Sequence, residues 1–220
     1  MFRLIYYLVI GLLLCSLSAS FFSCKKEAKC DCSADTIRVA KIFQPDGTIG
    51  KDAYVESILP NQNSGNSTIV SAFAWTNSGL FDTARVLIEF NLSVIPSLTR
   101  IKAAKFSLYW ASYGNLTDQT GENGFSIYRI TQEWDENTVT WNNKPSVSDL
   151  HKVIVPKSSN TTQSYYDIDV TTLIQDIIDN PQISHGFMLK LNTEYPYRLV
   201  VLASSDNATA AKRPKLVVYY

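Results

Sequence analysis

After an N-terminal apolar segment and a short charged stretch, apolar and polar residues alternate along short runs of the chain. This period of two limits the possible folds more than any other feature. The alternation is clearest over residues 37–42, 104–110 and 125–130. Turn-forming residues separate these runs, as at Asp46-Gly47 and over residues 57–67, which hold three Asn and three Ser. About ten to twelve short strands are expected, which predicts an all-β fold, a jelly-roll β-sandwich.

One stretch departs from the period of two and predicts a short helix. Its large apolar residues recur at helical spacing and fall on one face: Leu173, Ile174, Ile177 and Ile178. Thr171 or Thr172 is expected to cap the start of this helix, and Asn180-Pro181 is expected to end it. The predicted fold class is therefore all-β, a jelly-roll β-sandwich with one short helix, in a single domain over residues 36–220.

The N-terminus carries the features of a secretory signal peptide. Arg3 supplies a positive charge, a long apolar run follows, and the small residue Ser23 stands directly before Cys24. This arrangement resembles a bacterial lipobox, and the residues that follow resemble the start of Bacteroidota lipoproteins. The resemblance implies that Cys24 is lipidated and becomes the first residue of the mature protein. We therefore expect a signal peptide over residues 1–23 and a lipidated tether over residues 24–35.

Other interpretations of the N-terminus stay open at this point. Residues 4–22 would be barely long enough to cross a bilayer as an uncleaved helix, and Gly11 and several Ser weaken that interpretation. A plain secreted protein is a further alternative. The lipoprotein interpretation predicts anchoring in the outer membrane through the N-terminal lipid, at the cell surface. The mostly basic residues 25–29 leave the periplasmic face as an alternative location.

The charge balance of the chain bears on its possible partners, and the positions of its cysteines bear on how the domain is stabilised. The chain carries 20 Lys and Arg and 20 Asp and Glu, so its net charge is zero and no positive field attracts nucleic acid. The predicted domain contains no cysteine, because Cys32 is the last of the four in the chain. Core packing, and not disulfide bonding, must therefore stabilise the domain.

The sequence offers little for catalysis. His151 and His185 have no metal-ligand partner at a useful spacing, and the chain has no His-Glu-x-x-His, Gly-x-Ser-x-Gly or phosphate-binding glycine motif. The one tight acidic cluster comprises Glu133, Asp135 and Glu136. A turn before a strand explains it best, with a calcium site or a glycosidase pair as alternatives. We predict that the protein is not an enzyme.

Several segments, taken in order along the chain, resemble a DNRLRE-type domain. They are residues 52–55, 85–96, 101–108, 134–145, 169–171, 186–187 and 213–219. The most specific of them is residues 134–145, Trp-Asp-Glu-Asn-Thr-Val-Thr-Trp-Asn-Asn-Lys-Pro, whereas Asn91 departs from the Asp common in the family. The resemblance implies a β-sandwich module of secreted, often surface-attached microbial proteins. Some members of that family bind polysaccharides such as alginate, and others have no established ligand.

The resemblance to carbohydrate-binding sandwiches also implies a structural calcium ion as the one candidate cofactor, because many such modules carry one near the chain ends. Asp52 begins an early strand and Asp206 precedes the last one. Both are candidate calcium ligands, since calcium prefers carboxylate oxygens. The alternative is that both are turn residues.

Polysaccharide binding needs exposed aromatic rings that stack on the apolar face of a sugar while polar side chains bond its hydroxyl groups. The candidates for these roles are Tyr109, Tyr113, Trp75, Tyr195, Tyr197 and Arg198. Each could instead serve packing, and Trp134 and Trp141 are expected in the core or at a corner. The predicted function is non-catalytic binding of a polysaccharide. The first alternative is a structural or adhesive protein with an envelope protein partner, and a polysaccharide-degrading enzyme is a weaker one.

Overall fold

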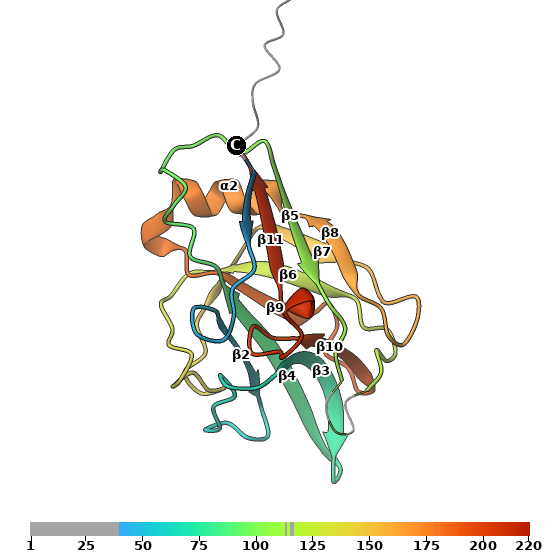
Figure 1. Ribbon diagram of the computed structural model, residues 1–220. Helices are drawn as coiled ribbons and strands as arrows, with labels where there is room; N and C mark the ends of the chain where they lie inside the picture. Colours follow the sequence, from blue (N-terminus) through green and yellow to red (C-terminus); the bar gives the residue numbers. More distant parts are fainter. Residues whose placement is uncertain (1–39, 113, 115–116) are drawn as a thin grey trace, which may run out of the picture. The chain divides into compact units, whose positions relative to one another are not determined.

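The computed structural model describes residues 40–112, 114 and 117–220, which form two antiparallel β-sheets and one α-helix (Figure 1). The four-stranded sheet has the order β1 (Ala40–Phe43), β11 (Lys215–Tyr219), β5 (Ala103–Leu108) and β8 (Tyr165–Asp169). The seven-stranded sheet has the order β10 (Arg198–Ala203), β3 (Ile69–Asn77), β4 (Leu80–Glu89), β9 (Phe187–Leu191), β6 (Phe125–Ile130) and β7 (Val147–Val155), with β2 (Lys51–Glu56) also on β4. The predicted all-β sandwich with one short helix is confirmed.

Strand β4 organises the larger sheet. Its residue Ala84 pairs with Phe73 of β3 on one edge and with Glu56 of β2 on the other. Two residues later, Val86 pairs with Tyr54 of β2 and with Leu189 of β9. Strands β3 and β9 therefore share one edge of β4, one after the other, while β2 covers the opposite edge. This branching separates two ends of the sheet, which carry the two sites described below.

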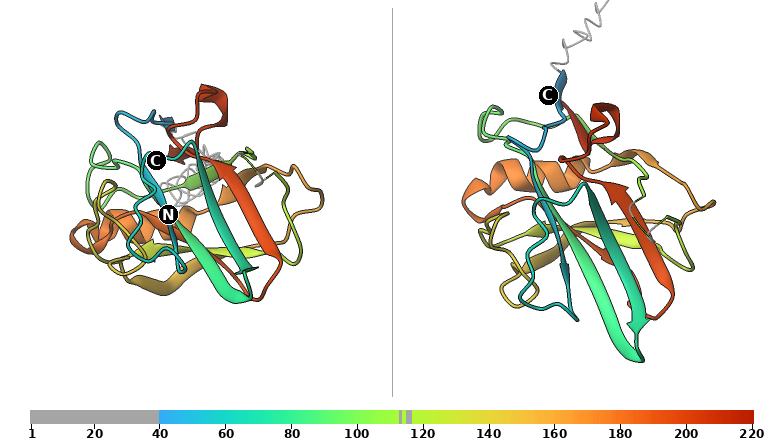
Figure 2. Two further views of the ribbon diagram at one scale, coloured as in Figure 1. Left: turned by 90° about the horizontal axis from the view of Figure 1, so that it is seen from below. Right: turned by 60° about the horizontal axis from the view of Figure 1, so that its bottom comes forward.

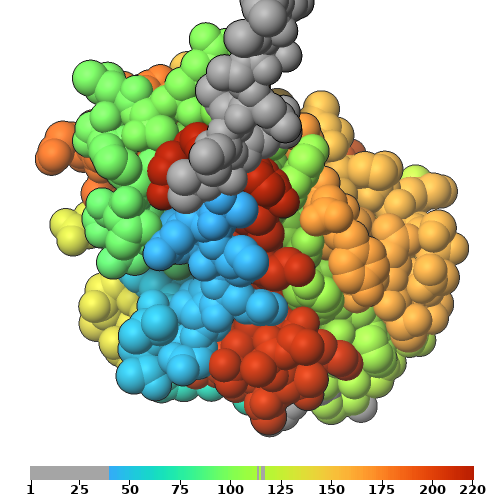
Figure 3. Space-filling model, turned by 45° about the horizontal axis from the view of Figure 1, so that its top comes forward, coloured from blue at the N-terminus to red at the C-terminus, as the bar shows by residue number. Residues whose placement is uncertain are grey.

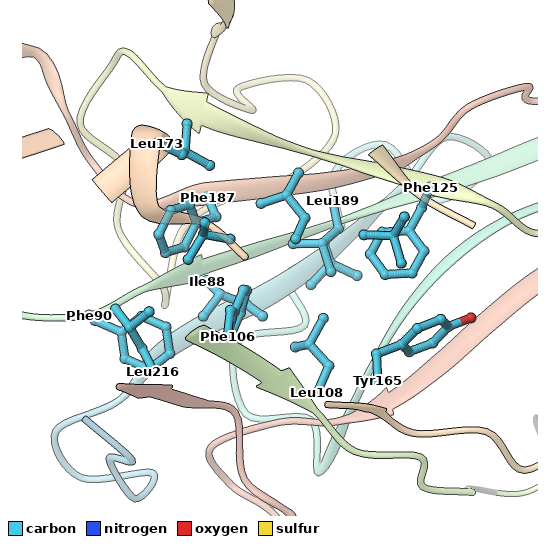
Figure 4. Packing of buried hydrophobic residues seen from close by; sticks show 14 of the residues in the cluster. Ile88, Phe90, Phe106, Leu108, Phe125, Tyr165, Leu173, Phe187, Leu189 and Leu216 are labelled. Carbon is cyan, nitrogen blue, oxygen red and sulfur yellow. The ribbon is translucent and has the colours of Figure 1, made fainter. Parts of the chain in front are cut away.

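The main core lies between the sheets and is built largely from aromatic and branched side chains. Phe106 of β5 and Phe187 of β9 come from opposite sheets, and their ring centroids lie 5.5 Å apart (Figure 4). Phe90 meets Phe106 edge to face at 5.6 Å, and Leu173 of the helix joins the same cluster. Because the described domain has no disulfide, this packing is the main source of its stability.

The helix α2 (Thr171–Asp179) matches its predicted extent, but the predicted cap is wrong. Val170 occupies the N-cap position and offers no side-chain hydrogen bond, whereas Asp169 Oδ1 accepts the backbone N–H of Thr171 at 3.0 Å. The hydroxyl oxygen of Thr171 instead accepts a hydrogen bond from the backbone N–H of Ala104 at 2.9 Å, so this threonine joins the helix to β5. The predicted apolar face is confirmed, since the four predicted residues are buried. Two short 3-10 helices, η1 (Pro181–Ile183) and η2 (Ala210–Lys212), lie in connections.

Strands β7 and β8 were not expected from the sequence, and both lie at sheet edges. An edge strand has one pairing partner and more exposure, so its apolar pattern is weak. Residues 149–152 of β7 are all exposed, for example.

Cys24, the tether and Tyr113 fall outside the described residues, as does the start of the strand expected at residues 37–42. Across the part of the chain that the structure describes, no helix is both long and apolar enough to cross a membrane.

Candidate functional site

A groove of about 620 Å³ opens where the β3–β4 hairpin meets β10 and the loop that follows β5. Figure 2 shows this hairpin, in teal and green, beside the red strand β10, and reaching beyond its neighbours. Trp75 and Asn77 of β3 line one side, Asp82 comes from β4, and Asp118 and Thr120 come from the loop. The groove therefore combines an indole ring with amide, hydroxyl and carboxylate groups.

Two predicted ligand-binding rings meet at this groove. The ring of Tyr197 stands perpendicular to that of Trp75, with 5.1 Å between their centroids. The hydroxyl oxygens of Tyr197 and Thr76 lie 3.4 Å apart. Trp75 is 39% exposed and Tyr197 is 57% exposed. Both rings are thus positioned by contacts with each other while they keep a large face open to solvent.

The backbone of Tyr197 has a left-handed conformation, with φ of 68°, which is rare for a bulky side chain. Gly121 lies directly against it, because a Cβ atom on Gly121 would collide with the Tyr197 carbonyl oxygen. The next residue, Arg198, begins β10 and pairs with Ala74 of β3. The surroundings therefore impose this strained conformation, as often occurs at binding sites.

Tyr195 and Arg198 extend the same surface. The guanidinium carbon of Arg198 lies 5.6 Å from the ring centroid of Tyr195, which is 65% exposed. The Nη1 atom of Arg198 donates a hydrogen bond to the carbonyl oxygen of Thr193 at 3.0 Å. Leu80 and Phe81 at the hairpin tip are also exposed, and sequence analysis did not single them out. Their place beside the Asn77-Ser78-Gly79 turn was the available signal.

Tyr109, the remaining aromatic candidate among the described residues, is not part of this groove. Tyr109 packs edge to face on Tyr166, with 5.6 Å between ring centroids, and it does not line the groove. The predictions for the two tryptophans are confirmed. Trp134 is buried, and Trp141 is partly buried beneath Arg85 and Lys144, which lie 5.1 and 4.1 Å from its ring centroid.

Among the described residues, the two charged ones that line the groove are both acidic. Asp118 is exposed, whereas Asp82 is buried, and its Oδ1 accepts hydrogen bonds from Ser57 Oγ and the backbone N–H of Ile58. Glu56 lies next to Asp82. Burial, together with the hydrogen bond and charge of Asp82, raises the pKa of Glu56 to about 7. The groove thus carries negative charge at its wall.

A separate cluster of three carboxylates lies toward the opposite end of β4. One carboxylate oxygen each from Asp52, Glu136 and Asp206 falls within 4.8 Å of the others. Asp52 belongs to β2, Glu136 follows β6, and Asp206 follows β10. The structure brings the two predicted candidates Asp52 and Asp206 together and adds Glu136, which sequence analysis assigned chiefly to a turn.

The three acidic residues Glu133, Asp135 and Glu136 have different environments. Asp135 serves the predicted turn, since its Oδ1 accepts the N–H of Asn137 at 2.9 Å and its carbonyl oxygen accepts the N–H of Val139 at 2.8 Å. Glu133 is exposed. Glu136 reaches Asp52 instead, and its Oε1 accepts the backbone N–H of Asp52 at 2.7 Å.

Asp52 is the buried member of the cluster, with 2% exposure. Its Oδ2 accepts the N–H of Ser205 at 2.7 Å, whereas its Oδ1 has no hydrogen-bond partner among the described residues. Burial raises the pKa of Asp52 to about 7, partly offset by the bonds from Ser205, and nearby Glu136 and Asp206 add to the increase. Burial also raises the pKa values of Glu136 and Asp206. The site therefore disfavours three negative charges unless a cation joins them.

Two close backbone approaches hold the outer carboxylates. A Cβ atom on Gly47 would collide with Asp206 Oδ1, so the turn at Gly47 lies against this side chain. Gly65 packs equally closely on the carbonyl oxygen of Glu136, which also accepts a hydrogen bond from Asn63 Nδ2 at 2.7 Å. The oxygen-only ligand set fits a hard divalent cation such as Ca²⁺.

Comparison with protein-family models identifies the family of the chain. The family model described as carbohydrate-binding module family 96 matches residues 46–220, which include both the groove and the carboxylate cluster. No curated protein matches the chain.

Proposed function

The chain belongs to carbohydrate-binding module family 96, and from this we propose that its sandwich binds a polysaccharide, without cleaving it, at the groove beside Trp75 and Tyr197. The family points to a non-catalytic binding domain. The observation that supports this place on the sandwich is the perpendicular pair of exposed rings at the groove. Within the family, we propose that the domain is of the DNRLRE type that residues 134–145 resemble.

The chemistry of the groove suits a sugar. The exposed indole and phenol faces offer apolar surfaces for the C–H groups of a pyranose ring, and aromatic residues supply large contact areas at low entropic cost. Asn77, Thr120 and Asp118 place amide, hydroxyl and carboxylate groups around these rings, where they can bond sugar hydroxyls. The strained Tyr197 backbone keeps its ring in place before binding. Binding a ligand therefore has to immobilise little of the protein, which lowers the entropic cost.

The charge at the groove favours a neutral polysaccharide over an acidic one. Asp82 and Asp118 line it, and Arg198 is held beside Tyr195 at its margin. A chain of uronic acids would place carboxylates next to these aspartates, and like charges repel. We expect this preference to distinguish the chain from those members of the DNRLRE-type family that bind alginate.

We further propose that the domain acts at the cell envelope, held to the outer membrane by a lipid on Cys24. The basic, apolar and small residues ahead of Cys24 support this part of the proposal. A lipid anchor together with a glycan-binding sandwich would hold a polysaccharide close to the cell surface.

An envelope protein partner is the second candidate for the same region. Leu80 is 63% exposed and Phe81 is 49% exposed at the hairpin tip, and exposed apolar surface of this kind often marks protein contacts. The binding experiment below separates the two candidates, because only the first requires a polysaccharide to bind the purified protein.

The proposed function is tested by affinity gel electrophoresis and calorimetry with the full chain in mild detergent. The probes are neutral β-glucan, galactan and xylan, with alginate and pectate as acidic probes. We expect at least one neutral polysaccharide to bind, and Trp75→Ala to weaken its binding about 10-fold or more. Tyr166→Ala is the matched control, because Tyr166 is an exposed ring that does not line the groove.

Two results would overturn the proposed site or function. If Tyr166→Ala abolishes binding and Trp75→Ala does not, the binding surface lies at the Tyr109–Tyr166 pair. If no polysaccharide of either class binds the folded wild-type protein, the protein-partner candidate takes precedence.

A further inference from the structure

We propose that Asp52, Glu136 and Asp206 bind one calcium ion that joins three distant segments of the chain. This inference does not depend on the polysaccharide groove. It rests on the environment of Asp52, on the charge balance of the cluster and on the segments from which the three carboxylates come.

One carboxylate oxygen of Asp52 has no hydrogen-bond partner among the described residues. This side chain is almost fully buried, and its Oδ2 accepts a hydrogen bond from the N–H of Ser205. Its Oδ1 has none, although a buried charged oxygen without a partner is costly and rare in native proteins. One oxygen each of Glu136 and Asp206 lies within 4.8 Å of a carboxylate oxygen of Asp52, and both residues act on Asp52 as negative neighbours. A cation at this point would satisfy the unpartnered oxygen.

The negative charge of the three carboxylates is not balanced by a salt bridge among the described residues. Among the described residues, none of the three carboxylates forms a salt bridge with Lys or Arg. Lys51 and Arg213 lie close enough to act on the charges of Glu136 and Asp206, but their direct contacts are elsewhere: Lys51 Nζ lies 2.6 Å from Glu89 Oε2, and Arg213 Nε donates to the carbonyl oxygen of Asn207 at 3.0 Å. Up to three negative charges thus share a partly buried site without a fixed positive partner.

The ligand chemistry selects the ion. All three donors are carboxylate oxygens, with no His or Cys in the group, which disfavours zinc and copper. Calcium accepts carboxylates in flexible geometry and completes its six to eight ligands with carbonyl oxygens and water. Magnesium demands a tighter octahedron and gives up its water reluctantly, so we expect it to bind more weakly here.

The three carboxylates come from segments that lie far apart in the sequence. Asp52 begins β2, Glu136 lies in the β6–β7 connection, and Asp206 lies between β10 and β11. Figure 3 shows the blue segment that starts at residue 40 against the red segment near the C-terminus, and the close approach of Gly47 to Asp206 belongs to this contact. An ion here would cross-link both ends of the domain and the connection between them, without any disulfide.

The cation site and the groove lie apart. Asp52 pairs with Ile88 of β4, whereas the groove residue Trp75 pairs with Asp82 of the same strand. These β4 positions are six residues apart, which corresponds to about 20 Å along a strand. Failure of one proposal would therefore be measured separately from failure of the other.

The test uses the full chain in mild detergent, stripped with EDTA and dialysed free of chelator. Calorimetric titration with CaCl2 should give one ion per chain. Scanning calorimetry should show a rise in Tm of about 4 to 8 °C at millimolar Ca²⁺ and a clearly smaller rise with Mg²⁺. Asp206→Asn should weaken Ca²⁺ binding at least about 10-fold. Glu133→Gln is the matched control, because this neighbouring acid is exposed and outside the cluster.

The Asp52→Asn variant distinguishes a loss of Ca²⁺ binding from a loss of folding. Asparagine keeps the shape but removes a buried charge, so the variant should be at least as stable as the wild type without metal and should lose the Ca²⁺ response. Trp75→Ala should keep that response. The proposal is overturned if wild-type protein shows no Ca²⁺ binding, or if Asp52→Asn and Asp206→Asn bind Ca²⁺ as tightly as Glu133→Gln.

Discussion

The ring of Trp75 meets the ring of Tyr197 at right angles, and the residue that presents the second ring has a strained, left-handed backbone. The contact joins the end of β3 to the residue before β10. Since neither ring is buried, core packing does not account for the strain. A binding role explains it better, because strain of this kind is retained where a side chain must be held in one position.

The first prediction compares two substitutions of Tyr197. Tyr197→Gly and Tyr197→Ala both remove the ring, so both should weaken polysaccharide binding about 10-fold or more. They should differ in stability, because glycine adopts a positive φ freely and alanine does not. We expect the glycine variant to be more stable by about 1 kcal/mol in denaturant unfolding. Equal stability of the two variants would show that the left-handed backbone stores no strain.

The second prediction concerns Gly121, which holds the same loop. Alanine at this position has both an unfavourable positive φ and a collision with the carbonyl oxygen of Tyr197. We expect Gly121→Ala to cost at least about 2 kcal/mol of unfolding free energy and to weaken polysaccharide binding.

Gly79→Ala is the control for that substitution. Gly79 also has a positive φ, but a Cβ there meets nothing within 4 Å. This variant should lose only the conformational part, about 1 kcal/mol. A Gly121→Ala loss no greater than the Gly79→Ala loss would contradict the role assigned to the close approach.

The third prediction is a pH dependence at Glu56. Its pKa is raised to about 7 in the folded protein, from 4.5, by burial and by Asp82. The folded state therefore favours the protonated form. The associated stability is fully present below about pH 4.5 and is lost as the pH rises through about 7.

Denaturant unfolding at pH 5 and pH 8 checks this prediction. Glu56→Gln carries no titrating group at this position, so the difference between the two proteins reports the titration of Glu56 together with its interaction with Asp82. Relative to Glu56→Gln, wild type should be about 1 to 2 kcal/mol less stable at pH 8 than at pH 5, a value reduced for the solvent that reaches this side chain. A difference independent of pH would refute the assignment.

The elements that sequence predicts well are those with a strong local pattern. Strand β6 and helix α2 have apolar residues at the spacing of their own geometry, so the predicted extents agree closely with the structure. Strands β7 and β8 lie at edges, where one missing neighbour relaxes the need for apolar residues. The cap of α2 was mispredicted because Thr171 has a tertiary partner, Ala104, that no local pattern reveals.

In the candidate sites too, the sequence identifies single residues but not the contacts between them. Sequence analysis selected Trp75, Tyr195 and Tyr197 as exposed aromatic residues, and their exposure follows from strand phase and turn position. That Tyr197 meets Trp75 whereas Tyr109 meets Tyr166 depends on how the strands pair. Likewise, Glu136 could not be joined to Asp52 and Asp206 from spacing, because the three lie in connections or strand ends that only the folded sheet brings together.

The fourth prediction concerns the ion pair that fastens α2 to the larger sheet. Arg129 Nε lies 2.9 Å from Asp176 Oδ2, and the two side chains are 6% and 9% exposed. Arg129 Nη1 also donates to the carbonyl oxygen of Ile183 at 2.7 Å. Asp176→Asn would leave a buried arginine charge without its partner, so we expect a loss of about 3 to 5 kcal/mol in unfolding free energy.

Two further variants make that prediction specific. Asp149→Asn removes an acid that pairs with Lys152 at the surface, and it should change stability by no more than about 0.5 kcal/mol. The double variant Arg129→Met with Asp176→Leu replaces both buried charges by apolar groups of similar size, and it should recover much of the loss. If Asp176→Asn were as mild as Asp149→Asn, the pair would not hold the helix. If the double variant were less stable than Asp176→Asn alone, an unpaired arginine would not be the cause of the loss.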